Sequence, residues 1–396
     1  MKYQTPDAAI DGLAKLLATV CVQSSTRQQV GRILAQDIVA DRDSPAADVS
    51  AMDGYAIRVS DLKRSGPIPV RGESSAGGPP PEMQSGSIVR IFTGAVIPDG
   101  CEAVVRREDT KESDREIVFL EAAITTRAGD NIRRAGENAK MGGVVVNAGT
   151  KVTAATAATM TSVGAYQADL YAPVRVIVLT TGDEVGRFEN ESPKPWQLRN
   201  SNRDSIVSFL SAQPWIDVVE PSHCHDDRDV LTRSLADCLQ RADAVLVSGG
   251  VSKGDYDYVP DVIRENGAEI VFHGLPIRPG KPILGAATSG GKLILGLPGN
   301  PVSAIVGAKR FAEPLLAKMS GQTDWKTPRP ILRLKDFGDK TLPLVWMRLV
   351  RIVGQGVCEL VPSQGSGDLV SLGQSSGFVE IPRGESGEGP WPFYAW

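Results

Sequence analysis

The second half of the chain alternates short apolar runs, rich in β-branched residues, with stretches of helical periodicity. The expected strands are residues 174–180, 215–220, 243–248, 268–273 and 292–296. The expected helices are residues 201–212, 227–240, 258–265 and 301–319. This alternation is typical of a doubly wound, mostly parallel sheet, in which helical crossovers cover both faces. The sequence therefore predicts a central α/β domain.

Polar and glycine-bearing segments lie where these expected strands end or the expected helices begin. They are residues 181–184 (TGDE), 248–258 (SGGVSKGDYDY), 278–282 (RPGKP) and 297–301 (LPGNP). In open α/β sheets, ligands bind outside the carboxyl ends of the strands. Four segments that carry both carboxylates and cations are hard to explain as turns alone, so we expect them to converge on one pocket.

The segment from Ser248 to Tyr258 has the most specific chemistry. Its glycines let backbone amides approach an anion, whereas the carboxylates that follow cannot hold a phosphate unless a cation lies between. We therefore expect a phosphorylated ligand bridged by a divalent metal; a plain glycine-rich turn is the alternative. The expected helix near Pro301 adds N-terminal amides that favour a phosphate. A P-loop is excluded, because Pro282 follows Lys281 where Ser or Thr is needed.

The rest of the chain has a different character. Residues 5–20 and a shorter stretch at about 27–35 show helical periodicity. Residues 43–131 are rich in glycine and proline with short apolar pieces, which is typical of a small β domain. Residues 139–172 turn helical again, and short alternating runs after residue 325 indicate a small β module. At 396 residues the chain is expected to hold more than one domain.

Polar side chains also lie next to turns in the expected β domain. Asp53 stands beside a glycine and an aromatic residue, and Thr93 precedes a glycine at the end of an apolar run. Arg133 and Arg134 have the side chain best shaped for bidentate phosphate binding. Each of these features alone is more often a capped turn or a surface ion pair.

Charge and cysteine content argue against several classes of function. The chain carries 43 basic and 47 acidic residues without a basic stripe, so we expect no long nucleic acid as partner. It shows neither a signal-peptide core nor an apolar run of roughly 18 residues, so we expect a cytoplasmic protein without membrane association. The five cysteines include no CxxC pair, and His223 and His225 have only His273 besides them, which argues against a disulfide framework and a zinc site.

The short motifs of this chain resemble those of the molybdopterin molybdenumtransferase family, the MoeA proteins, to which the C-terminal domain of gephyrin also belongs. The similar segments run through nearly the whole chain in the family's order. They are residues 50–56 (SAMDGYA), 91–95 (IFTGA), 131–137 (NIRRAGE), 181–184 (TGDE), 248–258 (SGGVSKGDYDY), 279–282 (PGKP), 297–303 (LPGNPVS) and 365–372 (GSGDLVSL).

The resemblance implies an elongated homodimer of four-domain subunits. The implied domains are residues 1–42 with 137–172 (helical, for dimerisation), 43–136 (an inserted β domain), 173–322 (the α/β molybdopterin-binding fold) and 323–396 (a small C-terminal β-barrel). The implied reaction inserts molybdenum from molybdate into the dithiolene of adenylylated molybdopterin and releases AMP in a Mg2+-dependent step. The implied partners are a molybdopterin adenylyltransferase and recipient molybdoenzymes.

The resemblance also implies which residues act. The expected catalytic residues are Glu184, Asp53, Asp257 and Thr93. The expected metal ligands are Glu184, Asp257 and Asp53. The residues expected to bind the pterin nucleotide are Gly182, Asp183, Asp226, Ser248, Gly249, Gly250, Ser252, Asp255, Arg278, Pro279, Gly280, Lys281, Pro298, Gly299, Asn300, Pro301, Arg133, Arg348 and Ser366. Glu184 and Asp257 are expected on the phosphate side, and Asp53 and Thr93 on the molybdate side across the dimer.

Two positions depart from the family pattern. Asn138 stands where the family often has Asp, which removes a carboxylate, and Arg278 stands where Lys is common, which keeps the charge. One alternative is an adenylyltransferase that loads molybdopterin with AMP from ATP, but that family resembles the α/β domain alone. Another alternative is a gephyrin-like scaffold without turnover, against which the lack of a long linker or low-complexity arm argues.

Overall fold

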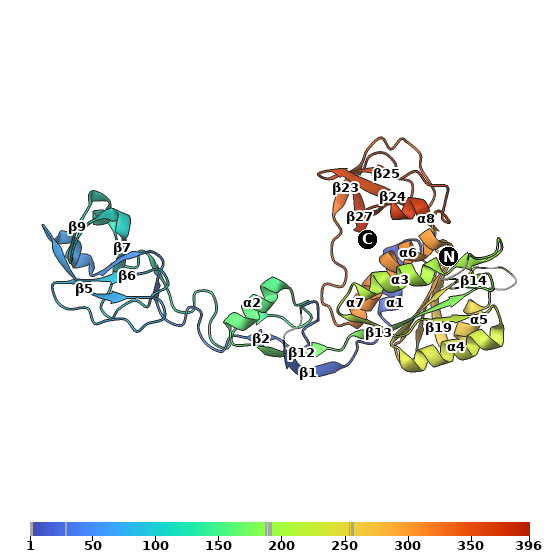
Figure 1. The fold of residues 1–396 in the computed structure, drawn as a ribbon, viewed down its shortest axis with the longest axis horizontal. Coiled ribbons are helices and arrows are strands. Elements are labelled where there is room, and N and C mark those ends of the chain that lie inside the picture. Colours follow the sequence, from blue (N-terminus) through green and yellow to red (C-terminus); the bar gives the residue numbers. More distant parts are fainter. Residues whose placement is uncertain (1–2, 28–29, 187, 189–191, 253, 255–256) are drawn as a thin grey trace. The chain divides into compact units, whose positions relative to one another are not determined.

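A computed structural model describes residues 3–27, 30–186, 188, 192–252, 254 and 257–396 (Figure 1). The chain forms two compact units. The large unit comprises Met1–Gln36, Ala148–Ala154 and Gln167–Trp396. The small unit comprises Asp37–Asn147 and Ala155–Tyr166. The chain therefore leaves the large unit after its first 36 residues and returns to it later.

The large unit is built around a sheet of seven strands in the described part of the chain. These are β13 (Val174–Thr181), β16 (Ile216–Val218), β17 (Ser222–Cys224), β18 (Ala244–Ser248), β19 (Ala268–His273), β21 (Leu284–Thr288) and β22 (Leu293–Leu297). Their order is β16–β13–β18–β22–β21–β19, and β17 also pairs with β13. Strands β16, β17, β13, β18 and β22 pair in parallel, whereas β21 is antiparallel to both of its neighbours. The expected doubly wound, mostly parallel sheet is confirmed.

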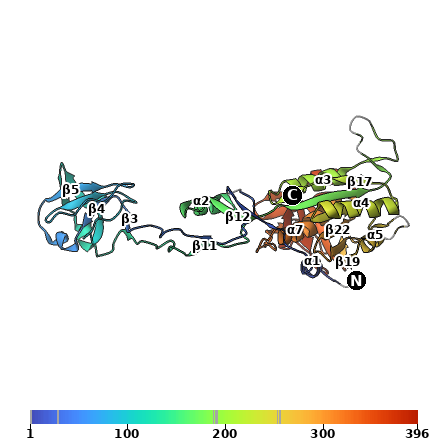
Figure 2. The same cartoon turned by 90° about the horizontal axis from the view of Figure 1, so that it is seen from below.

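Helices cover both faces of this sheet (Figure 1). The helices on one face are α4 (Arg228–Arg241) and α5 (Val259–Glu265). Those on the other are α1 (Pro6–Ala14), α3 (Ser201–Ser211), α6 (Pro301–Gly307) and α7 (Glu313–Met319), and α1 lies beside α7 (Figure 2). Each face of the sheet has its own apolar core. Along β13, Ile177 and Leu179 pack in the core under α4 and α5, whereas Val176 and Val178 pack in the core under α1, α3, α6 and α7. This alternation follows from the two-residue period of a strand and explains the continuous apolar run.

The C-terminal region of the large unit is a closed five-stranded barrel. Its strands are β23 (Ile331–Leu334), β24 (Val345–Gly354), β25 (Val357–Leu360), β26 (Gly377–Ile381) and β27 (Trp391–Ala395). Pairing of β24 with β26 closes the ring, and the short helix α8 (Leu369–Gly373) lies between β25 and β26 in the chain. The short strand β20 (Ile277–Arg278) pairs with β24 and joins the barrel to the α/β region. The expected C-terminal barrel is confirmed.

The small unit is mostly β structure. Its main sheet has the order β7 (Ala103–Arg106), β4 (Gly54–Ile57), β6 (Ile88–Ile91), β5 (Ile68–Ser74), β9 (Glu116–Phe119) and β8 (Thr110–Ser113). Two further antiparallel pairs are β3 (Val49–Ser50) with β10 (Ile132–Arg133), and β2 (Ile38–Val39) with β11 (Val144–Val146). Short 3-10 turns are η1 (Val59–Lys63), η2 (Arg107–Asp109) and η3 (Glu121–Thr125). The expected small β domain is present.

Some expected helices are shorter than expected or wrong. The helix expected over 5–20 ends at Ala14. The helix expected at 27–35 is wrong for its described part, because β1 (Val22–Arg27) pairs with β12 (Gln167–Tyr171) and Leu34 forms a further bridge to Leu170. Within 139–172, the helix is limited to α2 (Ala154–Ser162). Partners that lie far apart in the sequence override local helical periodicity here. No helix in the described part of the chain is both long and apolar enough to cross a bilayer.

A buried ion-pair network joins three parts of the large unit. Arg310 lies in η4 (Ala308–Ala312), a π-helical turn between α6 and α7. Its guanidinium donates to Glu380 on β26 at 2.5 Å and to Asp7 on α1 at 2.6 Å. Burial opposes the charge of Arg310, but attraction to Glu380 outweighs it and raises the Arg310 pKa. The Glu380 side chain is only 14% exposed, whereas that of Asp7 is 72% exposed.

We expect the two partners of Arg310 to differ sharply in their contribution to stability. Glu380→Gln leaves a buried cation without its buried counter-ion and should lower the free energy of unfolding by about 3 kcal/mol. Asp7→Asn removes an exposed partner of the same guanidinium and should cost less than about 1 kcal/mol. Urea unfolding followed by circular dichroism measures both variants. Equal losses in the two variants would contradict this account.

Candidate functional site

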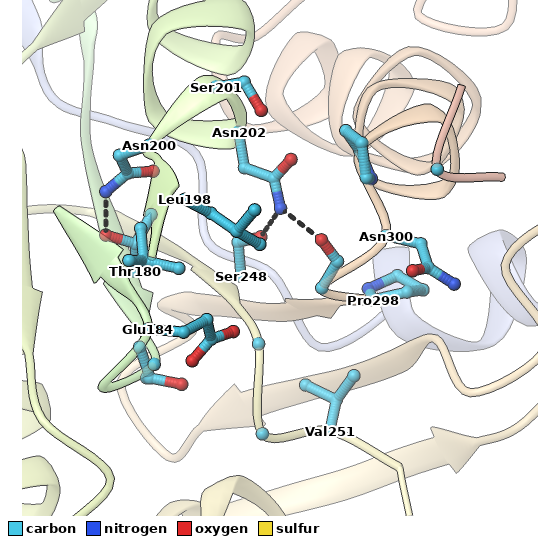
Figure 3. A pocket seen from close by; sticks show the side chains of 18 of the residues that line it. Thr180, Glu184, Leu198, Asn200, Ser201, Asn202, Ser248, Val251, Pro298 and Asn300 are labelled. Carbon is cyan, nitrogen blue, oxygen red and sulfur yellow. Dashed lines mark hydrogen bonds between the residues drawn. The ribbon is translucent and has the colours of Figure 1, made fainter. Parts of the chain in front are cut away.

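A cavity of about 830 Å³ lies in the large unit at the carboxyl ends of β13, β18 and β22 (Figure 3). From β13 the chain crosses to β16 on one side, and β18 lies on the other side of β13. This is a topological switch point, where open α/β sheets leave a crevice for ligands. Residues 180–182, 184–185, 248–252 and 298–301 contribute to the cavity wall. Three of the four segments singled out in the sequence therefore meet at one cavity, and Pro282 brings the end of the fourth to it.

Asn200 fixes the start of α3 at this cavity. Its Oδ1 accepts from the Arg203 amide at 3.1 Å, which caps the helix, and its Nδ2 donates to Thr180 Oγ1 at 2.8 Å. Thr180 Oγ1 also lies 2.9 Å from His223 Nδ1. Burial, followed by the nearby charge of His225, lowers the pKa of His223 and so favours the neutral imidazole in this contact. The ends of β13 and β17 are thereby joined to α3.

Asn202 ties the loop after β18 to the loop after β22. Its Nδ2 donates to Ser248 Oγ at 2.9 Å and to the Gly299 carbonyl at 2.7 Å (Figure 3). A carbonyl oxygen only accepts, so this contact fixes the orientation of the amide. Asn202 Oδ1 is shielded from solvent and accepts no hydrogen bond from the described residues. The cavity wall therefore contains a polar atom that a donor would stabilise.

The glycines after β18 are required by the backbone. Gly249 and Gly250 have φ angles of 105° and 62°, and a Cβ atom on Gly249 would lie 2.8 Å from Thr181 Oγ1. The Gly249 amide donates to the Leu297 carbonyl at 3.1 Å, so this N–H joins β18 to the end of β22. Because the Gly249 amide is already hydrogen-bonded, an anion in this cavity would have to be bound by the other amides of the turn and by the amides at the start of α3.

Among the described residues, three carboxylates line the cavity: Glu184, Asp226 and Asp257. Asp257 Oδ2 accepts from the Gly254 amide at 2.5 Å, which closes its own loop. Asp183 is not among the described residues that line the cavity. Its Oδ1 accepts from the Asp226 amide at 3.2 Å and lies 2.9 Å from His225 Nδ1, and these two contacts, in that order, lower its pKa. Asp183 therefore supports the loop that presents Asp226.

The expected cations Arg278, Lys281 and Arg348 are not among the described residues of the cavity wall, although Lys281 directly precedes Pro282, which lines it. Arg278 and Lys281 are exposed, and Arg348 stacks 4.5 Å above the Trp346 ring. Burial, followed by the positive charge of Arg278, lowers the pKa of Arg348. Mutual repulsion between two guanidinium groups favours an anion between them. Ser366 is uncharged, and its Oγ accepts a hydrogen bond from Asn300 Nδ2 at 3.0 Å.

Most of the other residues expected to bind the pterin nucleotide lie on the cavity wall. Ser252, Pro298, Gly299, Asn300, Pro301 and Gly182 line the cavity. Pro279 and Gly280 belong to the turn that follows β20. Asp255 lies outside the described residues. Among the described residues, no group of three or more His, Cys, Asp or Glu side chains is arranged to hold a metal ion.

The small unit holds Asp53, Thr93 and Arg133. Asp53 Oδ1 accepts from the Thr93 amide at 2.8 Å and from its hydroxyl at 2.7 Å. These two hydrogen bonds lower the pKa of Asp53, with smaller contributions from Arg107 and Arg90, which line the same small hollow. Arg133 donates to Glu137 at 2.5 Å and to Asn138 Oδ1 at 2.9 Å. It therefore forms the surface ion pair that was the alternative to phosphate binding.

Several cavity residues were missed from the sequence. They include Thr180, Gln197, Leu198, Asn200, Asn202 and Leu369. The Asn200-Ser201-Asn202 run before an expected helix is a recognisable N-cap signal, but its tertiary contacts are not local. Leu198 lies in none of the motifs, and Leu369 lies in the 365–372 motif without a polar group that would mark it as a site residue.

Comparison with known proteins places these segments in context. Residues 5–164 match the family model described as "MoeA N-terminal region (domain I and II)", and residues 177–318 match "Probable molybdopterin binding domain". The chain is 38% identical over 309 residues to a Haemophilus influenzae protein named molybdopterin molybdenumtransferase, covering 76% of this chain and 74% of that protein. A Nostoc protein of the same name is 32% identical over 371 residues, covering 90% and 84%.

The fold is similar to that of a solved structure as well. The crystal structure of a "molybdopterin biosynthesis moeA protein" from Pyrococcus horikoshii OT3 covers 99% of both chains with a TM-score of 0.82 and 25% identity. The resemblance inferred from the motifs is confirmed. Most of the cavity wall lies within residues 177–318.

We expect the Thr93 hydroxyl to control the protonation of Asp53. Thr93→Val removes the hydroxyl donor and keeps the amide donor, so the pKa of Asp53 should rise toward the ordinary carboxyl value without reaching it. A 13C NMR titration of the Asp53 carboxyl measures this change. Thr125→Val is the control, because the Thr125 hydroxyl donates to a backbone carbonyl. An unchanged Asp53 pKa in Thr93→Val would show that the Thr93 hydroxyl does not lower the pKa of this carboxyl.

Proposed function

Because this chain belongs to the molybdopterin molybdenumtransferase (MoeA) family, we propose that it inserts molybdenum from molybdate into adenylylated molybdopterin and releases AMP. The observation that carries this proposal is the cavity at the switch point of the sheet. Three carboxylates, a glycine turn and the start of α3 meet there, within residues matched to the molybdopterin binding model. The backbone amides of the turn and of the helix start suit a phosphate-linked nucleotide, provided that a divalent cation lies between its phosphates and the carboxylates.

A magnesium ion fits the donor set of this cavity. Mg2+ prefers oxygen ligands and is commonly held by one or two carboxylates together with substrate phosphates. Glu184 and Asp257 supply such oxygens, and the lack of a larger cluster of ligands among the described residues agrees with a site completed by substrate. When bound, the ion neutralises phosphate charge. We propose Glu184 and Asp257 as its protein ligands.

The chain's own residues then have separate tasks in cleaving the phosphoanhydride. Attack by a water or molybdate oxygen on phosphorus forms one P–O bond, and the anhydride P–O bond breaks as AMP leaves. When water attacks, its proton must be accepted, and Asp226 presents a carboxylate on the cavity wall. Lys281, which directly precedes the cavity residue Pro282, and Arg278 would stabilise the negative charge that develops on the departing phosphate.

Insertion of molybdenum needs no change of oxidation state. Two Mo–S bonds form, two S–H bonds break, and one molybdate oxygen leaves as water with both protons. We propose a homodimer in which Asp53 and Thr93 act on the molybdate side of the reaction. Asp53 is ionised and would repel an oxyanion alone, so Arg90 and Arg107 in the same hollow would balance its charge.

The cellular setting is also a proposal. The described cysteines are free thiols, and burial raises the pKa of Cys224, Cys238 and Cys358 to about 11, which keeps them inert. Free thiols suit a reducing compartment, so we propose a cytoplasmic location. An adenylyltransferase would supply the substrate, and molybdoenzymes would receive the product.

We expect Glu184→Gln to lower the rate of AMP release from adenylylated molybdopterin by about a hundredfold, because the amide is a poor ligand for a divalent cation. Chromatographic quantification of AMP, with molybdate and Mg2+ present, measures the rate. Glu220→Gln is the matched control, since Glu220 is exposed and is not among the described residues of the cavity wall. Undiminished turnover in Glu184→Gln would remove the central assignment, and no AMP release by the wild-type protein would remove the proposed function.

A further inference from the structure

The cavity wall includes apolar side chains that the proposed chemistry does not explain. Leu198 and Leu369 both line it, and they are 58% and 40% exposed. Leu198 belongs to β15 (Leu198–Arg199), whereas Leu369 is the first residue of α8 in the barrel region. Two leucines from distant parts of the chain therefore expose apolar surface to the same cavity. Covering that surface would be favourable.

Both leucines are held on hydrogen-bonded backbone. The Leu198 amide donates to the Glu184 carbonyl at 2.7 Å, and β15 pairs with β14 (Val185–Gly186). Leu369 follows Asp368, whose carboxylate accepts from the Ser371 amide at 3.1 Å and the Gln364 amide at 3.0 Å. The backbone that carries each of these side chains is thus held by local hydrogen bonds. A site whose apolar groups are preorganised loses less entropy when a ligand binds.

We propose that Leu198 and Leu369 form a clamp for a planar heteroaromatic ring of the substrate. This inference rests on the proposed function, since its substrate carries two such rings, an adenine and a pterin. The faces of such a ring are apolar and would contact the leucines. Its edges carry N–H donors and ring acceptors, for which Gln197 and Asn202 lie on the same cavity wall. The phosphates would then lie toward Glu184, which is adjacent to Leu198 through the β14–β15 pairing.

The clamp can be tested by calorimetric titration of the full-length protein with three probes: AMP, ribose 5-phosphate and pterin-6-carboxylate. Ribose 5-phosphate lacks a ring, so its affinity reports the phosphate subsite alone. The double variant Leu198→Ala, Leu369→Ala should bind one ring-bearing probe about tenfold more weakly and ribose 5-phosphate unchanged. Val370→Ala is the matched control, because Val370 is 71% exposed next to Leu369 but is not among the described cavity residues. Unchanged thermal midpoints verify folding.

The identity of the weakened probe assigns the ring. Loss of AMP affinity places the adenine in the clamp, and loss of pterin-6-carboxylate affinity places the pterin there. The clamp is overturned if the double variant keeps wild-type affinity for both ring-bearing probes, or if the wild-type protein binds neither of them more tightly than ribose 5-phosphate. Because AMP release is measured separately, a failed clamp leaves the proposed function standing.

Discussion

The parallel pairing of β13, β18 and β22 is the interaction on which the site depends. Thr180 pairs with Ser248, and Ser248 pairs with Leu297, so the three strands end at one level. Each loop that follows therefore begins at the same edge of the sheet. Because the strands are buried on both faces, a slip of one residue would exchange the two apolar cores, which makes this register costly to change.

Two asparagines at the start of α3 convert this common edge into a defined cavity. Asn200 joins the helix to β13, and Asn202 joins the loops after β18 and β22. The amide side chain suits this task because it donates and accepts in a fixed plane. With these loops held, the carboxylates and the leucines of one cavity wall are available to different parts of one substrate.

The sequence predicts the architecture well and the site only in part. Long β-branched runs such as residues 174–180 identify buried strands, but β21 (Leu284–Thr288), composed largely of glycine, alanine and leucine, lacks that signal. The β1–β12 pair and the Asn202 contacts join residues that are distant in the chain, so local periodicity cannot reveal them. The motif-based predictions of Glu184, Asp226 and Asp257 name residues that do line the cavity, whereas Leu198 and Leu369 carry no pattern that distinguishes them from core leucines.

The most direct test of a phosphate-binding cavity at this edge is amide NMR of the protein labelled with 15N at glycine, titrated with AMP in the presence of Mg2+. The account predicts that the resonances of Gly182, Gly249, Gly250 and Gly299, all on the cavity wall, shift together. The amide resonances of glycines in the small unit, such as Gly66 and Gly86, should not shift. Shifts confined to glycines away from the cavity, with those four unmoved, would contradict it.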